Sequence, residues 1–343
     1  PLVGDVSGNI KKLISIRSKL DDDIDILVAP ELYVSGYPID DLVLREDFLN
    51  LVEREINKLV KSTDDSKSAI IVGAPRKDNE SIKNSVFVIE NGKIISIKDK
   101  YELPNTGVFD EQRIFKQGSL EDCVEIKGVK FGLPICEDIW ESTVLKKLCS
   151  SGAEIIIAIN ASPFTTSKSD ERSSVTSLRV DEIKLPIIYL NRTGGQDELI
   201  FDGSSFALNH DGKKFYSSSE FKEETSVVDF QKLNGKWIGT GKLNNSSSSE
   251  ERLYKALVLG LRDYVNNNKF PGVVLGLSGG IDSALVAAVA ADAFGSDLVQ
   301  AIMLPSPYTG KESLSDAKEV AELLKIKYSN LKISEAMKIV ENI

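Results

Sequence analysis

Short apolar segments alternate with amphipathic ones through the first two-thirds of the chain, and this alternation restricts the possible folds more than any other feature. Residues 25–32, 68–75 and 154–164 are apolar runs of strand length, as is typical of buried strands. Residues 10–20 and 44–63 instead repeat apolar side chains at helical spacing. The pattern therefore predicts an α/β fold in which helices cover a buried sheet.

Residues 84–100 carry a different signal, that of a β-hairpin. Asn91 and Gly92 stand between two apolar strands, and Asn-Gly is a preferred pair for a tight turn. The remaining elements of this region are expected in the order strand 129–138, helix 142–153, strand 185–195 and strand 204–217. Because β-α-β crossovers and hairpins are mixed, we expect a mixed sheet or a pair of sheets with helices outside.

A polar, low-complexity stretch, residues 242–251, is the best candidate for a domain boundary. It leads into a helical pattern over residues 251–268 and then into a strand, a glycine loop and a helix over residues 272–295. This second region has only about 90 residues, too few for a complete doubly wound nucleotide-binding domain, so we expect a fragment of a longer chain. The predicted division is a first domain at 1–241, a linker at 242–250 and an incomplete second domain at 251–343.

Charge and cysteine content argue against several classes of function. A net charge of -10 without a run of Lys and Arg disfavours nucleic acid or an anionic membrane as partner. Three cysteines without a C-x-x-C pair, together with a single histidine, disfavour a zinc site and suit the reducing cytoplasm. No apolar run approaches the roughly 18 residues that a membrane helix needs. We therefore expect a cytoplasmic protein.

The loop "GLSGGIDS", residues 276–283, lies between a buried strand and the start of a helix. Backbone N–H groups at a helix N-terminus bind anions, and glycines let the backbone approach phosphate oxygens. Ser278 and Ser283 add hydroxyl donors, and Asp282 is a candidate ligand for a Mg²⁺ ion. No Lys follows the glycines, so the loop differs from G-x-x-x-x-G-K-[ST]. From the glycines alone, a purely structural turn is as good an interpretation as a phosphate site.

Cys136 is expected at the end of a strand, where a side chain can project into a site. The lone histidine, His210, lies in a turn-like stretch and is a poor candidate for its base. Glu31 and Lys100 also follow strands. A glutamate can take a thiol proton, and a lysine can stabilise an oxyanion. The alternative is an inert, buried cysteine, and Glu137 and Asp138 either shape the following turn or lie in the site.

Three stretches resemble the sequence signatures of the nitrilase, or carbon–nitrogen hydrolase, superfamily with its Glu-Lys-Cys triad. They are "APELYVSGYP", "KYELPNTGVFDE" and "PICEDIW". The string S-G-G-x-D-S resembles the loop of N-type ATP pyrophosphatases. "NASPF", "GGQDELIFDG" and "YKALVLGLRDY" are similar to the glutamine-dependent NAD synthetases, which join a nitrilase-type glutaminase to such a synthetase. The resemblance implies a nitrilase-type α-β-β-α sandwich, followed by the start of a Rossmann-like parallel α/β domain.

The resemblance also implies roles for individual residues. Glu31 would be the general base, Cys136 the nucleophile that forms a γ-glutamyl thioester, and Lys100 the group that stabilises the tetrahedral intermediate. Glu111 falls at an acidic position that supports this triad. The glutamine substrate would be contacted from three positions, namely Thr106, Ser162 and Lys168. At Thr106 this chain departs from the family, which usually has tyrosine there, and this departure puts the positioning of glutamine in question.

For the glycine loop the resemblance implies an ATP site, with Mg²⁺ held at Asp282. The ATP-binding residues would be Gly276, Leu277, Ser278, Gly279, Gly280, Ile281, Asp282 and Ser283. The implied reaction uses ammonia from glutamine to amidate ATP-activated deamido-NAD, with release of AMP and pyrophosphate. A homo-oligomer is implied as well.

Two other hypotheses remain open at the level of the sequence. One is a nitrilase-family amidase that acts on another small amide. The other is a catalytically inactive sensor that only binds glutamine or a nucleotide. Intact Glu31, Lys100, Cys136 and the S-G-G-x-D-S string argue against a sensor, whereas Thr106 favours it weakly.

Overall fold

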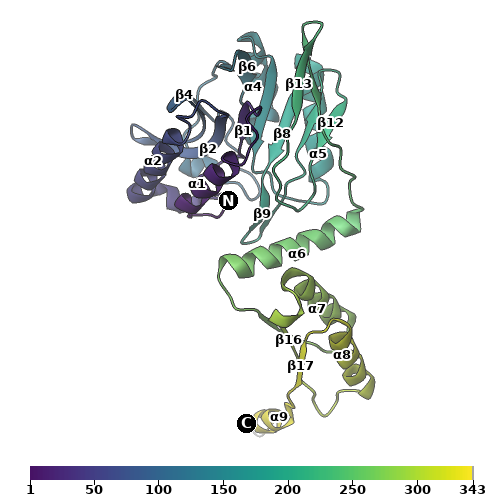
Figure 1. Cartoon of the computed structure of the whole chain (residues 1–343). Coiled ribbons are helices and arrows are strands. Elements are labelled where there is room, and N and C mark those ends of the chain that lie inside the picture. Colours follow the sequence, from purple (N-terminus) through teal and green to yellow (C-terminus); the bar gives the residue numbers. More distant parts are fainter. Residues whose placement is uncertain (342–343) are drawn as a thin grey trace. The chain divides into compact units, whose positions relative to one another are not determined.

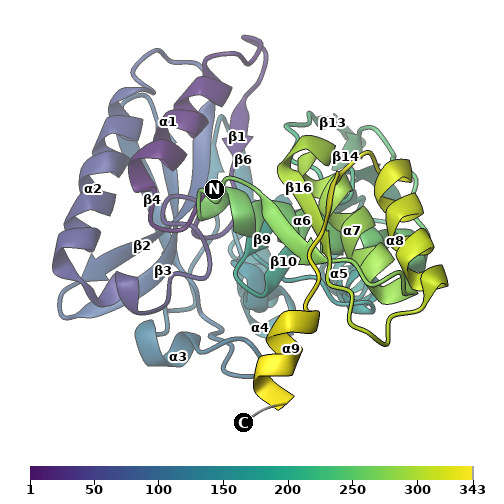
Figure 2. The same ribbon diagram turned by 90° about the horizontal axis from the view of Figure 1, so that it is seen from below.

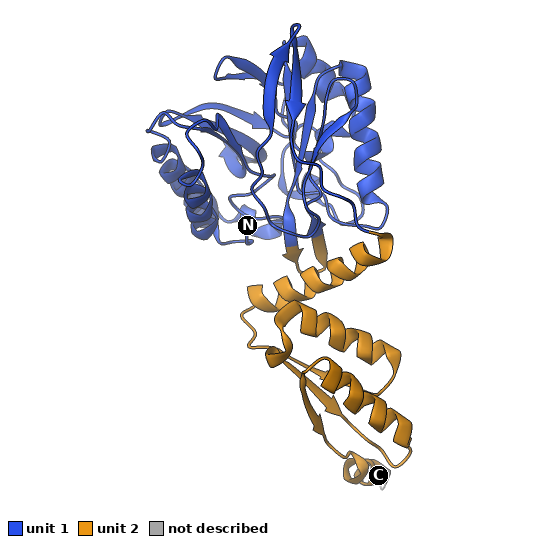
Figure 3. Ribbon diagram, turned by 45° about the vertical axis from the view of Figure 1, so that its right-hand side comes forward, with its two compact units in different colours: residues 1–194, 201–247 blue, residues 195–200, 248–343 orange. Residues whose placement is uncertain are grey.

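A computed structural model describes residues 1–341 of the chain (Figure 1). The chain divides into two compact units (Figure 3). Unit 1 comprises residues 1–194 and 201–247, and unit 2 comprises residues 195–200 and 248–343. The division at 247/248 falls inside the polar stretch singled out in the sequence. The assignment of residues 1–241, 242–250 and 251–343 as domain, linker and domain stays a prediction.

Unit 1 contains two sheets, each covered by helices. The first has the strand order β1-β2-β3-β4, with β1 and β2 parallel and the other pairs antiparallel. Its strands are β1 (Ile26–Val28), β2 (Ala69–Asp78), β3 (Ser81–Glu90) and β4 (Lys93–Asp99). Helix α2 (Glu46–Lys61) packs on this sheet beside α1 (Val6–Arg17) (Figures 1 and 2). The apolar residues of α2 are at helical spacing, so one face of this helix is buried and the other is polar.

The second sheet has the order β12-β11-β8-β7-β6-β5, with a parallel centre formed by β6, β7 and β8. Its strands are β5 (Val124–Ile126), β6 (Val129–Gly132), β7 (Ile155–Asn160), β8 (Ile187–Asn191), β11 (Phe206–Leu208) and β12 (Lys214–Ser217). The helices α4 (Ser142–Ser150) and α5 (Lys168–Ile183) cover one face. β7 is buried along its whole length, as expected for a central parallel strand.

The two sheets pack face to face. One core cluster contains Ile71 of β2 and Val88 of β3 together with Phe131 of β6 and Ile157 of β7. The layers therefore run helix, sheet, sheet, helix, which confirms the expected α-β-β-α sandwich. Short elements complete the unit: η1 (Asp40–Leu44), α3 (Glu111–Ile114), η2 (Cys136–Ile139), β13 (Asp229–Leu233) and β14 (Lys236–Thr240). The strands β9 (Thr193–Gln196) and β10 (Leu199–Asp202) pair with each other, and residues 195–200 of this pair belong to unit 2.

Unit 2 is a parallel α/β structure. Its sheet has the order β15-β16-β17, and both pairs are parallel. The elements are α6 (Ser249–Asn267), β15 (Val273–Gly276), α7 (Ile281–Phe294), η3 (Ser296–Leu298), β16 (Val299–Met303), α8 (Lys311–Leu323), β17 (Lys327–Asn330) and α9 (Ser334–Glu341). Ala287 of α7 and Ala317 of α8 pack on the sheet in one core cluster. This is the Rossmann-like arrangement that the sequence predicts.

In the described part of the chain, no helix is both long and apolar enough to span a lipid bilayer.

Candidate active site

One buried lysine links two buried carboxylates at the centre of unit 1. Lys100 Nζ lies 2.8 Å from Glu31 Oε1. The same nitrogen lies 2.8 Å from Oε2 and 3.0 Å from Oε1 of Glu111. All three side chains are almost completely shielded from solvent. Buried charges are stable only when they are paired and hydrogen-bonded, so this cluster holds its members in a fixed geometry.

Glu31 is held on both carboxylate oxygens. Its Oε1 accepts a further hydrogen bond from Asn84 Nδ2 at 2.8 Å, and its Oε2 accepts one from the Ala161 backbone N–H at 3.0 Å. The segment that carries Glu31 lies against Gly73 of β2. A Cβ at Gly73 would come within 2.8 Å of Glu31 Cα, so only glycine permits this close approach.

Lys100 directly follows β4, and its charge is maintained by its neighbours. Burial by itself lowers the pKa of Lys100, but the carboxylates of Glu111 and Glu31 outweigh this effect and hold the pKa well above its ordinary value. The side chain is therefore an ammonium ion throughout the neutral range. A buried ammonium can stabilise negative charge that develops on a reacting oxygen.

Cys136 begins the turn η2 and is buried. Its backbone has φ = +48°, a left-handed conformation that residues other than glycine rarely adopt. Burial raises the pKa of the Cys136 thiol well above its ordinary value. The Glu31 carboxylate raises this pKa further, and Lys100 lowers it. The resting cysteine is thus a thiol, which needs a base before it can act as a nucleophile.

Glu111 is the first residue of α3 and supports the lysine from the other side. Besides the bonds from Lys100, its Oε1 accepts a hydrogen bond from Tyr37 Oη at 3.0 Å. Burial raises the pKa of Glu111, while the Lys100 ammonium opposes that rise. The backbone N–H of Ala161, which bonds Glu31, also lowers the pKa of Cys136, so the thiol and the carboxylate cluster share one buried site.

The three positions predicted to contact glutamine differ in their surroundings. Ser162 is buried just beyond β7, one residue after the Ala161 N–H that bonds Glu31. Lys168 begins α5, and its ammonium lies 4.1 Å from the centre of the Trp140 ring. Thr106 is exposed in the loop before α3. The structure therefore places Ser162 next to the buried carboxylate cluster and leaves Thr106 at the surface.

Arg172 of α5 is a residue that the sequence did not single out. It is fully buried and donates to Ser162 Oγ at 3.0 Å and to Ser162 O at 2.7 Å. Its Nη1 pairs with Asp202 Oδ1 at 2.8 Å. Because guanidinium nitrogens only donate, Ser162 Oγ accepts this bond and keeps its own hydrogen for another partner. Nothing in the polar sequence around Arg172 distinguishes it from a surface residue of a helix.

The two carboxylates that follow Cys136 point in different directions. Glu137 is half-buried, and burial raises its pKa while the ammonium groups of Lys100 and Lys168 lower it. Asp138 is buried, and backbone N–H groups surround its carboxylate. Glu137 therefore belongs to the electrostatics of the site, whereas Asp138 belongs to its framework.

The glycine loop of unit 2 has the geometry of a helix-start anion site. Ser278 Oγ lies 3.1 Å from Ser283 Oγ and accepts from the Gly280 N–H at 3.3 Å. Gly279 has φ = +85°, and a Cβ there would lie 2.3 Å from the Ser313 carbonyl oxygen, so a larger residue cannot replace it. Except for the buried Leu277, the loop is wholly or partly open to solvent, and α7 starts at Ile281.

Asp282 is an exposed carboxylate in the first turn of α7. Within residues 1–341 no group of three or more metal-type side chains converges. Mg²⁺ is often held by only one or two carboxylates together with substrate phosphates, so the position of Asp282 fits such an ion.

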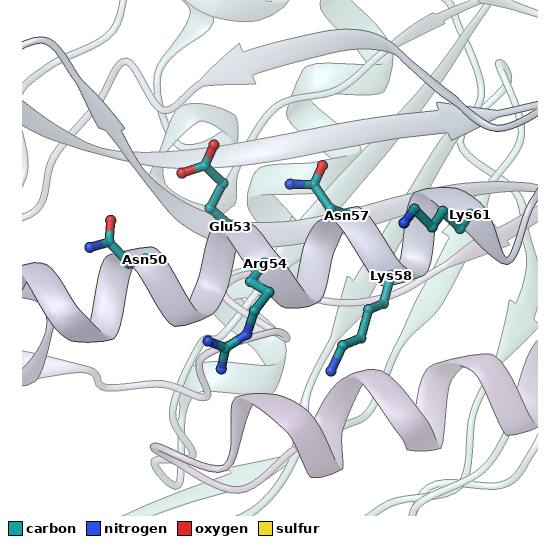
Figure 4. Close-up of a pocket in the computed structure, with 6 residues that line it drawn as sticks. All are labelled: Asn50, Glu53, Arg54, Asn57, Lys58 and Lys61. Carbon is teal, nitrogen blue, oxygen red and sulfur yellow. The ribbon is translucent and has the colours of Figure 1, made fainter.

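A surface hollow of about 350 Å³ runs along α2 (Figure 4). It is lined only by polar side chains of that helix, which are Asn50, Glu53, Arg54, Asn57, Lys58 and Lys61. None of these is a predicted site residue, and no aliphatic or aromatic residue of the kind that lines most small-molecule sites is among them.

Comparison with known proteins finds two family matches along the chain. Residues 3–238 match the carbon–nitrogen hydrolase family and residues 253–343 match the NAD synthase family. A glutamine-dependent NAD(+) synthetase of Rhodobacter capsulatus is 38% identical over 335 residues, which cover 97% of this chain and 60% of that protein. The chain thus spans about three fifths of this relative's length.

Solved structures agree with these matches. The glutamine-dependent NAD+ synthetase of Acinetobacter baumannii, in complex with ADP, is 34% identical and aligns with a TM-score of 0.93. That alignment covers 100% of this chain and 65% of the other. A carbon–nitrogen hydrolase of Helicobacter pylori G27, 21% identical, aligns with a TM-score of 0.58 over 65% of this chain and 84% of its own. At this identity the likeness concerns the fold alone.

Proposed function

The chain belongs to the carbon–nitrogen hydrolase family, and from this premise we propose that it forms the glutaminase and the first part of the ligase of a glutamine-dependent NAD synthetase. The observation that supports the glutaminase best is the buried Lys100 ammonium, bonded to Glu31 and Glu111, in the same site as Cys136. A buried thiol, a carboxylate and an ammonium are together sufficient for acyl transfer from an amide.

The first half of the proposed reaction forms a thioester. Glu31 takes the proton of Cys136 while Sγ attacks the side-chain carbonyl carbon of glutamine, and the Lys100 ammonium stabilises the oxyanion. Glu31 then gives the proton to the leaving nitrogen, the C–N bond breaks, and ammonia departs. In the second half, Glu31 removes a proton from water, and the resulting hydroxide attacks the thioester carbonyl carbon. The C–S bond breaks, Glu31 returns its proton to Sγ, and glutamate is released.

Glu31 suits the role of base because its carboxylate is already oriented. Asn84, Lys100 and the Ala161 N–H direct its two oxygens without blocking all their acceptor positions. Glu111 accepts a hydrogen bond from Lys100 and another from Tyr37, so Tyr37 holds Glu111 and Glu111 keeps the Lys100 ammonium in place. For the binding of glutamine we assign Ser162, the Lys168 ammonium and Thr106. At position 106 a threonine stands where this family usually has tyrosine, so the aromatic ring is missing there.

In unit 2 we assign residues 276–283 to ATP and Asp282 to magnesium. The metal, when bound, would neutralise negative charge on the phosphates. The loop supplies backbone N–H and hydroxyl donors at the start of α7. In the proposed reaction deamido-NAD is adenylated, ammonia attacks it, and NAD and AMP are released after pyrophosphate. A homo-oligomer in the cytoplasm is part of the same proposal and rests on the family resemblance.

The test is Cys136→Ala in the full-length protein. It removes the nucleophile only, so we expect NAD formation with glutamine to fall by about 10³-fold or more, while formation with free ammonia is unchanged. Both rates are measured as NAD produced from deamido-NAD and ATP. Loss of both activities would contradict the two-site proposal. Trapping of the thioester with a panel of small amides would show whether another amide is the better substrate.

A further inference from the structure

Asp138 forms an unusual junction between two catalytic segments. Its carboxylate is buried and makes no salt bridge within residues 1–341. Instead it accepts three backbone hydrogen bonds, from Ile135 N at 2.9 Å, Glu102 N at 2.8 Å and Tyr101 N at 3.1 Å. A buried carboxylate is costly unless its oxygens are satisfied, so the three donors and the carboxylate depend on one another.

One side of this junction is the turn that carries the nucleophile. Asp138 Oδ2 accepts from the N–H of Ile135, and the Asp138 N–H donates to the Ile135 carbonyl at 3.1 Å. Cys136 lies between them in the left-handed region, with φ = +48°. Such a conformation persists only where the surroundings enforce it. Asp138 thus holds the residue before Cys136 through both its side chain and its backbone.

The other side is the segment that carries the lysine. β4 ends at Asp99, and Lys100 is still tied to the sheet because its N–H donates to the Asn84 carbonyl at 2.8 Å. The next two N–H groups, of Tyr101 and Glu102, have left the sheet and both bond to Asp138 Oδ1. Lys100 is therefore fixed between the sheet on one side and Asp138 on the other.

We propose that Asp138 is a positioning residue that sets the location of the Lys100 ammonium relative to the Cys136 thiol. The bonds that the Asp138 carboxylate accepts come from the backbone N–H groups of the two segments, so we assign Asp138 to their framework. Glu31 differs because it bonds the Lys100 ammonium itself. The effect on rate rests on the glutaminase proposed above. The structural effect, the anchoring of residues 101 and 102 to residue 135, is independent of it.

Two substitutions at Asp138 remove these hydrogen bonds to different extents. Asp138→Asn keeps the shape and one acceptor oxygen, so it can retain the bonds from Tyr101 and Glu102 but sets an N–H against that of Ile135. Asp138→Ala removes all three acceptors. Asp211→Asn is the matched control, because Asp211 also accepts a backbone bond, from Lys213 at 3.0 Å, but in an exposed turn.

The measurements are kcat and KM for glutamine hydrolysis by the full-length protein, and amide hydrogen exchange of the peptide that contains Tyr101 and Glu102. A displacement of the order of 1 Å in an active site can cost about 10²-fold in rate, so we expect kcat to fall by about 10- to 100-fold in Asp138→Asn. We expect a larger fall in Asp138→Ala, with KM little changed in both variants. Exchange should accelerate in Asp138→Ala, and Asp211→Asn should match the wild type.

Several results would overturn the proposal. Wild-type kcat in a folded Asp138→Asn protein is one. A loss of kcat in Asp211→Asn as large as that in Asp138→Asn is another, because the effect would then not depend on the buried junction. If activity fell only in proportion to the fraction of folded protein, Asp138 would contribute to stability and not to the positioning of Lys100. If Asp138→Ala does not fold, Asp138→Asn carries the kinetic test. Should the wild type fail to hydrolyse glutamine, the proposed function fails. Unchanged exchange of the peptide with Tyr101 and Glu102 in Asp138→Ala would refute the anchoring itself.

Discussion

A single ammonium stands between two carboxylates in the buried cluster, so negative groups outnumber positive ones there. Glu31 is compensated by three donors, whereas Glu111 depends on Lys100 and Tyr37. Burial raises the pKa of Glu111 in spite of Lys100. Lys100 is consequently both a candidate catalytic group and the cation that compensates two buried carboxylates.

Replacement of Lys100 by Ala should therefore damage stability as well as activity. The substitution leaves Glu31 and Glu111 buried without a cation, and removal of one partner from a buried ion pair typically costs about 3–5 kcal/mol. Urea denaturation at pH 7 measures the change in the free energy of unfolding. The control is Lys98→Ala, because Lys98 pairs with Glu121 at 3.1 Å near the surface, where such a pair contributes about 1 kcal/mol or less. Equal costs for the two variants would show that the cluster is not held by Lys100.

At this scale the sequence indicates only part of the site. Glu31, Lys100 and Cys136 stand out because reactive side chains follow apolar strands, and the structure brings Lys100 into contact with Glu31. Arg172 and Asn84 could not be found in the same way. Each acts on a residue far away in the sequence, and the polar side chain itself looks like one that faces solvent. Their roles depend on tertiary contacts that local patterns do not encode.

Among the elements, α1 is joined to the end of α2 by one arginine. Arg17 is buried and forms a two-pronged pair with Asp65, at 2.7 and 2.9 Å. The same guanidinium donates to the carbonyl oxygens of Ser62 and Ser68. The hydrogen bonds from Arg17 lower the pKa of Asp65 from its ordinary 3.8 to about 2.

This shift predicts a pH dependence of stability. Because the pKa of Asp65 is lower in the folded state, the pair stabilises the fold fully above about pH 4, and this contribution disappears as the pH falls toward 2. The difference in unfolding free energy between the wild type and Asp65→Asn should thus shrink between about pH 4 and pH 2 in urea denaturation. In an Arg17→Met background the same substitution should show no such trend. A trend that persists there would assign the effect to another group.

Helices, strands and turns were predictable from the sequence where neighbouring residues determine them. The hairpin of β3 and β4 turns at Asn91 and Gly92, both with positive φ, as the Asn-Gly pair indicates. The strand expected over residues 129–138 instead ends at Gly132, and residues 136–139 form the turn η2. That turn is held by Asp138 through bonds to residues 101 and 102, which lie far away in the sequence. Helix α6 begins at Ser249, because the Ser248 side chain caps it by accepting from the Glu251 N–H.

For the whole molecule, the order of sequence motifs indicates two kinds of chemistry, and each compact unit carries one set. The thiol, carboxylates and ammonium lie in unit 1, and the glycine loop lies in unit 2. The sequence alone predicts both fold types, since strand–helix alternation and a strand–glycine loop–helix pattern are local. The family resemblance also predicts that two sheets pack on each other. The side chains through which they pack, Ile71, Val88 and Ile157, are a property of the assembled core.

Such a division predicts that a substitution in the loop of unit 2 has the opposite effect to Cys136→Ala: it impairs the ligase activity and spares the hydrolysis of glutamine. Asp282→Asn keeps the size of the side chain but removes the charge proposed to hold magnesium, so NAD formation should fall by about 10²-fold or more with either ammonia or glutamine. Single-turnover release of glutamate from glutamine, measured without ATP, should be unchanged, because Cys136 and its partners lie in the other unit. Asp297→Asn, an exposed carboxylate of the same unit, is the control and should retain both activities. If Asp282→Asn abolished glutamate release together with NAD formation, the two chemistries would not be separable by unit, and the assignment of hydrolysis to unit 1 alone would have to be abandoned.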